Sequence, residues 1–142
     1  MKQAIILIAG GGTRFGSRTL ACPKCMLEVQ GKSLLARMLT HLNQAGIKET
    51  ILVVGFQADL VRRHIGQQWD SMLVQYIYND KWETTNNVVS LAMATDSLNQ
   101  DFILLEGDLI FKWEAFVKML GPNRIAVDCF LPNMDGTVVS ID

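Results

Sequence analysis

The chain of 142 residues is long enough for one domain with its own hydrophobic core. Hydrophobic residues make up 49% and charged residues 19% of the sequence, which is typical of a globular protein and argues against disorder. Thirteen basic and fourteen acidic residues give a formal net charge of −1, so we expect no general attraction to nucleic acid or to an anionic membrane.

Apolar runs and helical periodicities alternate from the first residues onward. A continuous apolar run predicts a buried strand at 4–9, followed by a long loop to about Gly31. The spacing of apolar residues then predicts a helix at 32–46, a strand at 50–56 and a helix at 58–69. The run at 4–9 is too short for a membrane span or a secretion signal, and the three cysteines are an odd number, so we expect a cytoplasmic protein with reduced thiols.

The second half of the chain continues the alternation. The predicted elements are a strand at 72–79, a helix at 86–98, a strand at 101–108, a helix at 112–121, and strands at 124–130 and 137–142. Together they predict an α/β fold with right-handed crossovers, a Rossmann-like three-layer αβα arrangement around a mainly parallel sheet. Because the last predicted strand reaches Asp142, we expect residues 1–142 to be a domain shortened at its C-terminal side.

Three glycines, Gly10, Gly11 and Gly12, directly follow the first predicted strand. They remove side chains where a ligand would approach, and ligands of doubly wound sheets bind beyond the carboxyl ends of the strands. Neither the P-loop nor the dinucleotide-binding pattern G-x-G-x-x-G fits this stretch. Arg14 and Lys24 supply the positive charge that a bound triphosphate requires. The alternative is a glycine-rich surface loop with two solvated cations.

The stretch "LIAGGGTRFGSRTLACPKCML" resembles the signature of the nucleotidyltransferases that activate sugar phosphates and related phosphorylated alcohols. The resemblance implies that a substrate phosphate attacks the α-phosphorus of a nucleoside triphosphate and that pyrophosphate leaves. Arg14 would hold the β- and γ-phosphates, and Lys24 would stabilise charge in the transition state, so these two are the implied catalytic residues. The residues implied to bind nucleotide in this region are Ala9, Gly10, Gly11, Gly12, Thr13, Arg14, Lys24 and Gly107.

The strand predicted at 101–108 ends in the acidic turn Glu106-Gly107-Asp108. By the same resemblance Asp108 is the implied ligand of Mg2+, which binds one or two carboxylates together with substrate phosphates. The alternative is an ordinary Gly-Asp turn. A second metal carboxylate and much of the acceptor pocket come from later in the family's fold, and neither Asp128 nor Asp142 is assigned to the metal.

The stretch "YNDKWETTNNVVSLAMA" resembles the phosphocholine cytidylyltransferase-like branch, whose relatives also activate aminoalkyl phosphonates. This resemblance implies CTP as nucleotide and a small phosphorylated acceptor such as phosphocholine or an aminoalkyl phosphonate. The amides of Asn79, Asn86 and Asn87 would contact the base or ribose. Alternatively Asn86 and Asn87 only cap the helix, for which Thr85 is also a predicted cap.

Other assignments stay open at this point. The enzyme alternative is a sugar-1-phosphate nucleotidyltransferase that uses UTP or dTTP, and the non-enzyme alternative is a shortened domain that binds a nucleotide or a partner without turnover. Four aromatic residues are candidates for a quaternary ammonium site or for the core: Tyr78, Trp82, Phe111 and Trp113. The pair Cys22 and Cys25 admits a zinc or redox role, although no histidine has a matching spacing.

Overall fold

A five-stranded sheet forms the centre of the molecule. The computed structural model describes residues 2–12, 22–96, 98, 100–129 and 131. The strand order is β5-β6-β4-β1-β7. The four parallel strands are β1 (Gln3–Ile8), β4 (Glu49–Val54), β6 (Met72–Tyr78) and β7 (Phe102–Glu106), and the short β5 (Gln68–Trp69) pairs antiparallel with β6. The expected α/β class with a mainly parallel sheet is confirmed.

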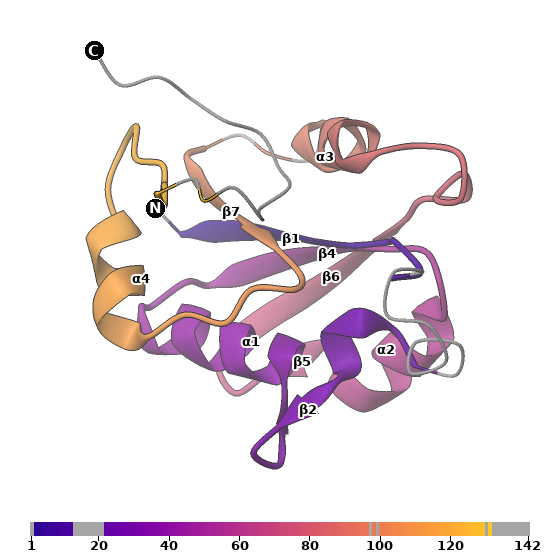
Figure 1. Ribbon diagram of the computed structural model, residues 1–142, viewed down its shortest axis with the longest axis horizontal. Helices are drawn as coiled ribbons and strands as arrows, with labels where there is room; N and C mark the ends of the chain where they lie inside the picture. The colour runs from indigo at the N-terminus through magenta and orange to yellow at the C-terminus, as the bar shows by residue number, and fades with distance from the viewer. Residues whose placement is uncertain (1, 13–21, 97, 99, 130, 132–142) are drawn as a thin grey trace.

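Helices cover both faces of the sheet, but unequally (Figure 1). One face packs against α1 (Leu34–Gln44), α2 (Ala58–Ile65) and α4 (Trp113–Met119), whereas α3 (Asn87–Thr95) packs on the other. All six residues of β1 are buried, which explains why its apolar run shows no alternation. Among the described residues, no helix combines the length and the apolar composition needed to cross a bilayer.

The sheet reverses its strand order between β1 and β7. The chain moves outward from β1 to β4 and β6, and α3 then returns it to β7 on the opposite side of β1. Leu7 of β1 lies opposite Glu106 of β7, and the Gly107 N–H donates to the Leu7 carbonyl oxygen at 3.0 Å. The carboxyl ends of these two strands therefore lie side by side, at the place where ligands of such sheets bind.

The loop predicted before α1 and the helix predicted at 58–69 differ from the structure. The long loop before α1 contains a 3-10 helix, η2 (Lys24–Met26), and a hairpin of β2 (Glu28–Val29) and β3 (Lys32–Ser33), whose turn residues Gln30 and Gly31 both have positive φ. The helix predicted at 58–69 ends at Ile65, because Gly66 with φ of 74° breaks it before β5.

The strand predicted at 124–130 is wrong for residues 124–129, which lie in no strand. A strand needs a hydrogen-bonding neighbour, and within the described residues nothing pairs with the outer edge of β7. Ile125 and Val127 are accordingly exposed. The strand predicted at 137–142 lies outside the described residues.

Candidate active site

The glycine loop leaves β1 at the buried Ala9, whose carbonyl oxygen accepts from the Phe56 N–H at 2.9 Å. A Cβ built on the exposed Gly10 would meet none of the described atoms within 4 Å. At Gly11 it would lie 3.1 Å from the Trp82 ring, and Gly12 has φ of 65°. Packing and backbone conformation thus account for Gly11 and Gly12 but not for Gly10, whose open backbone suits a ligand.

Trp82 forms a wall of this loop. Its ring packs against Phe56 with 5.4 Å between ring centroids, and it lies so close to Gly55 that a Cβ there would be 2.6 Å from the Trp82 Cβ. The segment between β6 and α3 is therefore docked onto the ends of β1 and β4. From the sequence, Trp82 was one of four aromatic candidates for a ligand site or the core. Gly11 and Gly55 both lie against its side chain, and these two small residues are the sequence feature that is consistent with its position.

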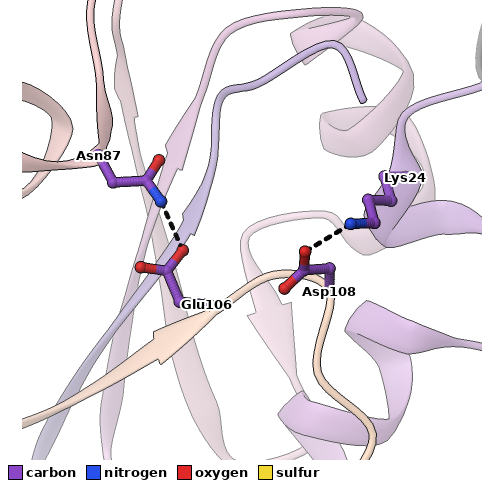
Figure 2. A network of polar contacts seen from close by, with 4 residues as sticks. All are labelled: Lys24, Asn87, Glu106 and Asp108. Atoms are coloured by element: carbon purple, nitrogen blue, oxygen red, sulfur yellow. Dashed lines mark hydrogen bonds and ion pairs between the residues drawn. The ribbon is translucent and has the colours of Figure 1, made fainter. Parts of the chain in front are cut away.

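Lys24 and Asp108, predicted respectively as a catalytic residue and a metal ligand, meet in an ion pair. Lys24 begins η2 directly after Pro23, and Asp108 follows β7 by two residues. The Lys24 Nζ lies 2.5 Å from the Asp108 Oδ2, across 84 positions of sequence (Figure 2). The side chains are 26% and 43% exposed, and such pairs contribute about 0–1 kcal/mol to stability. Stability alone does not account for bringing them together.

Gly107 allows β7 to approach β1 closely. A Cβ at this buried position would lie 2.1 Å from the Ile8 Cγ2 and 2.8 Å from the Leu7 carbonyl oxygen. No side chain fits there without displacing the strand end that carries Asp108. The Gly107 predicted to bind nucleotide therefore has a packing requirement of its own, and its contact with nucleotide stays a prediction.

Glu106 is a site residue that the sequence analysis did not assign. Its carboxylate accepts from the Asn87 Nδ2 at 2.8 Å, at the first residue of α3 (Figure 2). Burial raises the pKa of Glu106, the Asn87 hydrogen bond lowers it, and the nearby Asp108 charge raises it further. Two carboxylates thus flank Gly107, Asp108 in an ion pair with Lys24 and Glu106 in a hydrogen bond with Asn87.

Among the asparagines, Asn79 and Asn86 are occupied inside the protein. Asn79 is 2% exposed, its Nδ2 donates to the Thr85 and Ser90 hydroxyls at 3.0 Å each, and its Oδ1 accepts from the Lys81 N–H. Asn86 caps α3 by accepting from the Val88 N–H at 3.2 Å, so Thr85 as the cap was wrong. The contacts of these asparagines with nucleotide stay predictions, and Asn87 is the one whose amide meets the acidic turn.

The remaining predicted site residues are Thr13, Arg14 and the two cysteines of the Cys22–Cys25 pair. Thr13 and Arg14 lie outside the described residues. All three cysteines are free thiols, and burial raises the pKa of Cys25 to about 12. Within the described part of the chain, no cluster of three His, Cys, Asp or Glu side chains exists, so a zinc site at Cys22 and Cys25 lacks further ligands. Mg2+ needs fewer protein ligands, because phosphates and water complete its shell, and the carboxylates of Glu106 and Asp108 fit it.

Comparison with known proteins identifies a family model and several similar proteins. The family model for the MobA-like NTP transferase domain matches residues 4–137. The CMP-5'-(3-aminopropyl)phosphonate synthase of Streptomyces rubellomurinus is 36% identical over 99% of this chain and 23% of its own length. The choline-phosphate cytidylyltransferase of Haemophilus influenzae is 32% identical over 81% of this chain and 47% of its own.

A solved structure shares the same architecture. The CTP:phosphocholine cytidylyltransferase from Streptococcus pneumoniae superposes with a TM-score of 0.63 at 30% identity, covering 76% of this chain and 46% of that one. Sugar-1-phosphate uridylyltransferases and guanylyltransferases also match. The chain therefore spans half or less of the length of these relatives.

Proposed function

Because the chain belongs to the MobA-like NTP transferase family, we propose that it is the nucleotide-binding part of a cytidylyltransferase, which transfers CMP from CTP to a small phosphate or phosphonate and releases pyrophosphate. The observation that carries the proposal is the Lys24–Asp108 pair beside the glycine loop. It joins the cation of the Pro-Lys motif and the acid of the Gly-Asp turn at the sheet's switch point.

The chain's own residues supply binding and charge stabilisation. The open backbone at Gly10 receives the triphosphate, and Arg14 and Lys24 neutralise its charge. Asp108 holds the Lys24 ammonium at this position before substrate binds. When the attacking phosphate or phosphonate oxygen approaches the α-phosphorus, negative charge builds on the departing pyrophosphate, and a positioned cation stabilises it.

Mg2+ is part of the proposal, and Asp108 with Glu106 are the residues that would hold it. Both carboxylates lie at the carboxyl end of β7, next to the end of β1, and Mg2+ binds through one or two carboxylates together with substrate phosphates. When bound, Mg2+ neutralises phosphate charge and orients the triphosphate.

CTP and the acceptor class rest on the activities of the relatives. One is a CMP-5'-(3-aminopropyl)phosphonate synthase, two are choline-phosphate cytidylyltransferases, and another is a CTP:phosphoglutamine cytidylyltransferase. The second candidate, a sugar-1-phosphate nucleotidyltransferase, is favoured by the matching uridylyltransferase from Haloferax volcanii. The three free thiols fit a reducing compartment, so a cytoplasmic location belongs to the same proposal.

Calorimetric titration of the chain with CTP, UTP, ATP and GTP in Mg2+ buffer tests the nucleotide. Selective CTP binding, followed by pyrophosphate release with phosphocholine or 3-aminopropylphosphonate, is the expected result. Preference for UTP would move the function to the sugar-phosphate candidate. A folded chain that binds no nucleotide would contradict the proposal for this chain and leave the domain as a binding module for a partner.

Lys24→Ala tests the mechanism. We expect transfer to fall by about 10²–10³-fold, as for loss of a charge-stabilising group, with an unchanged melting temperature because the pair is exposed. Lys48→Ala is the matched control, since Lys48 is exposed and precedes β4, at the amino ends of the parallel strands and so at the end of the sheet away from the site. Full activity of Lys24→Ala would remove Lys24 from the mechanism.

A further inference from the structure

A pocket of about 120 Å³ lies between α1 and the segment 109–111. This segment follows Asp108 and runs along α1 toward α4 (Figure 1). Its lining combines polar and apolar residues. The polar ones are Lys32 and, on α1, Arg37, Thr40 and His41; the apolar ones are Met38 of α1 and the segment 109–111. None of these residues belongs to the proposed nucleotide site.

The two cations of this pocket have neutral hydrogen-bond partners. The Lys32 Nζ donates to the Thr40 hydroxyl at 2.7 Å, and the Arg37 Nη2 donates to the Val29 carbonyl oxygen. Within the residues that the structure describes, neither cation forms an ion pair. Both are therefore held in place by neutral acceptors, and their positive charge is left for a ligand.

The surroundings of His41 indicate that the pocket is electropositive. Burial lowers the pKa of His41, and the charges of Lys32 and Arg37 lower it further. Glu114 of α4 is the acidic group that acts in the opposite sense, and its effect is the smallest of the four. The ring packs among Phe111, Trp113 and Phe116, which hold it in position.

Two polar atoms here have no partner among the described residues. The Arg37 Nε and the His41 Nδ1 are shielded from solvent and form no hydrogen bond. Buried polar atoms in proteins almost always have a partner, and none of the described residues supplies one for these two. Oxygen atoms of an anion in the pocket would provide acceptors for the guanidinium.

We propose that this pocket binds a small organic oxyanion, of the class of a phosphate monoester with an apolar group, at a site separate from the nucleotide. Lys32 and Arg37 bind the oxyanion, and the apolar group packs on Met38 and the segment 109–111. Because that segment continues from Asp108, the ligand contacts the loop that carries the Lys24 ion pair.

The two histidines of the chain provide the test, because His41 lines the pocket and His64 lies exposed on α2. Phenyl phosphate and inorganic phosphate are titrated into the chain while the imidazole signals are followed by NMR. We expect saturable shifts at His41 and none at His64, and a higher His41 pKa with ligand, because a nearby anion stabilises the imidazolium. Phenyl phosphate binds more tightly than inorganic phosphate because only it has an apolar group.

Variants separate this pocket from other anion sites. Arg37→Gln and Lys32→Gln should each weaken phenyl phosphate binding about tenfold or more. Arg63→Gln, an exposed position on α2, should not. Melting curves establish that each variant is folded, and either pocket variant suffices if the other unfolds. Equal shifts at both histidines, no saturable shift at His41, or unchanged affinity in a folded pocket variant would overturn the proposal. The test uses no nucleotide, so it stands apart from the proposed transferase activity.

Discussion

The contact between β7 and β1 at Gly107 gives a prediction that joins stability to the site. In Gly107→Ala the new methyl group would lie 2.1 Å from the Ile8 Cγ2 and 2.8 Å from the Leu7 carbonyl oxygen. Both neighbours belong to β1, between β4 and β7, and are buried, so the end of β7 must move. Such overpacking costs about 1–3 kcal/mol, and the lower entropy of the unfolded chain offsets about 0.4–1 kcal/mol of it.

The expected net loss is therefore on the order of 1–2 kcal/mol, a fall in melting temperature of roughly 3–10 °C for a domain of this size. Urea denaturation and calorimetry measure it. Nucleotide transfer should fall as well, because the displacement separates Asp108 from Lys24.

Gly10→Ala is the matched control for Gly107→Ala. A Cβ at Gly10 meets none of the described atoms within 4 Å, so this variant should keep the wild-type stability or gain slightly. It should nevertheless weaken nucleotide binding if the triphosphate approaches this backbone. The reasoning is refuted if Gly107→Ala is as stable as the wild type, or if both variants lose the same stability.

Three more expectations concern single groups. The pKa of Glu106 is raised in the folded chain, so its contribution to stability is present below the unfolded pKa and is lost as pH rises through the folded pKa. Glu106→Gln should therefore be more stable than the wild type in urea denaturation at pH 7 and equally stable near pH 3, and equal stability at both pH values would contradict the raised pKa. Asn86→Ala should cost about 1 kcal/mol of unfolding free energy by loss of the α3 cap, and Asn86→Asp, which keeps the acceptor, should not; unchanged stability of Asn86→Ala in urea denaturation would contradict the cap. Iodoacetamide at pH 8 should label the exposed Cys129 first and the buried Cys25 last, because the pKa of Cys25 is about 12; mass spectrometry showing early Cys25 labelling would contradict its burial.

Much of the fold follows from local patterns. The strand predicted from the apolar run at 4–9 and the helix predicted from apolar spacing at 32–46 are confirmed as β1 and α1. Each was predictable because the residues that become buried form a local pattern in the sequence. The strand at 124–129 fails for a different reason, since its apolar residues have no neighbouring strand within the described residues. Pairing partners far apart in sequence leave no local signal.

The candidate site shows the same division. Lys24 and Asp108 were predicted from motifs, and the structure brings them together. Glu106 and Trp82 were not assigned, because their roles depend on side chains that meet only after folding: Asn87 from α3 in one case, the glycines at 11 and 55 in the other. Asn79 was predicted from its motif to bind nucleotide. In the structure its amide donates hydrogen bonds to Thr85 and Ser90 within the protein, which the sequence did not indicate.

The hydrogen bonds of Asn79 also affect how a ligand would bind. They connect the end of β6 to Thr85 and to Ser90 of α3, so the short segment that carries Trp82 is fastened at both ends. A wall of the glycine loop is thereby preorganised, and its conformational entropy is lost during folding and not during association. Ligand entry should then be limited by diffusion and charge, with no slow ordering of this segment.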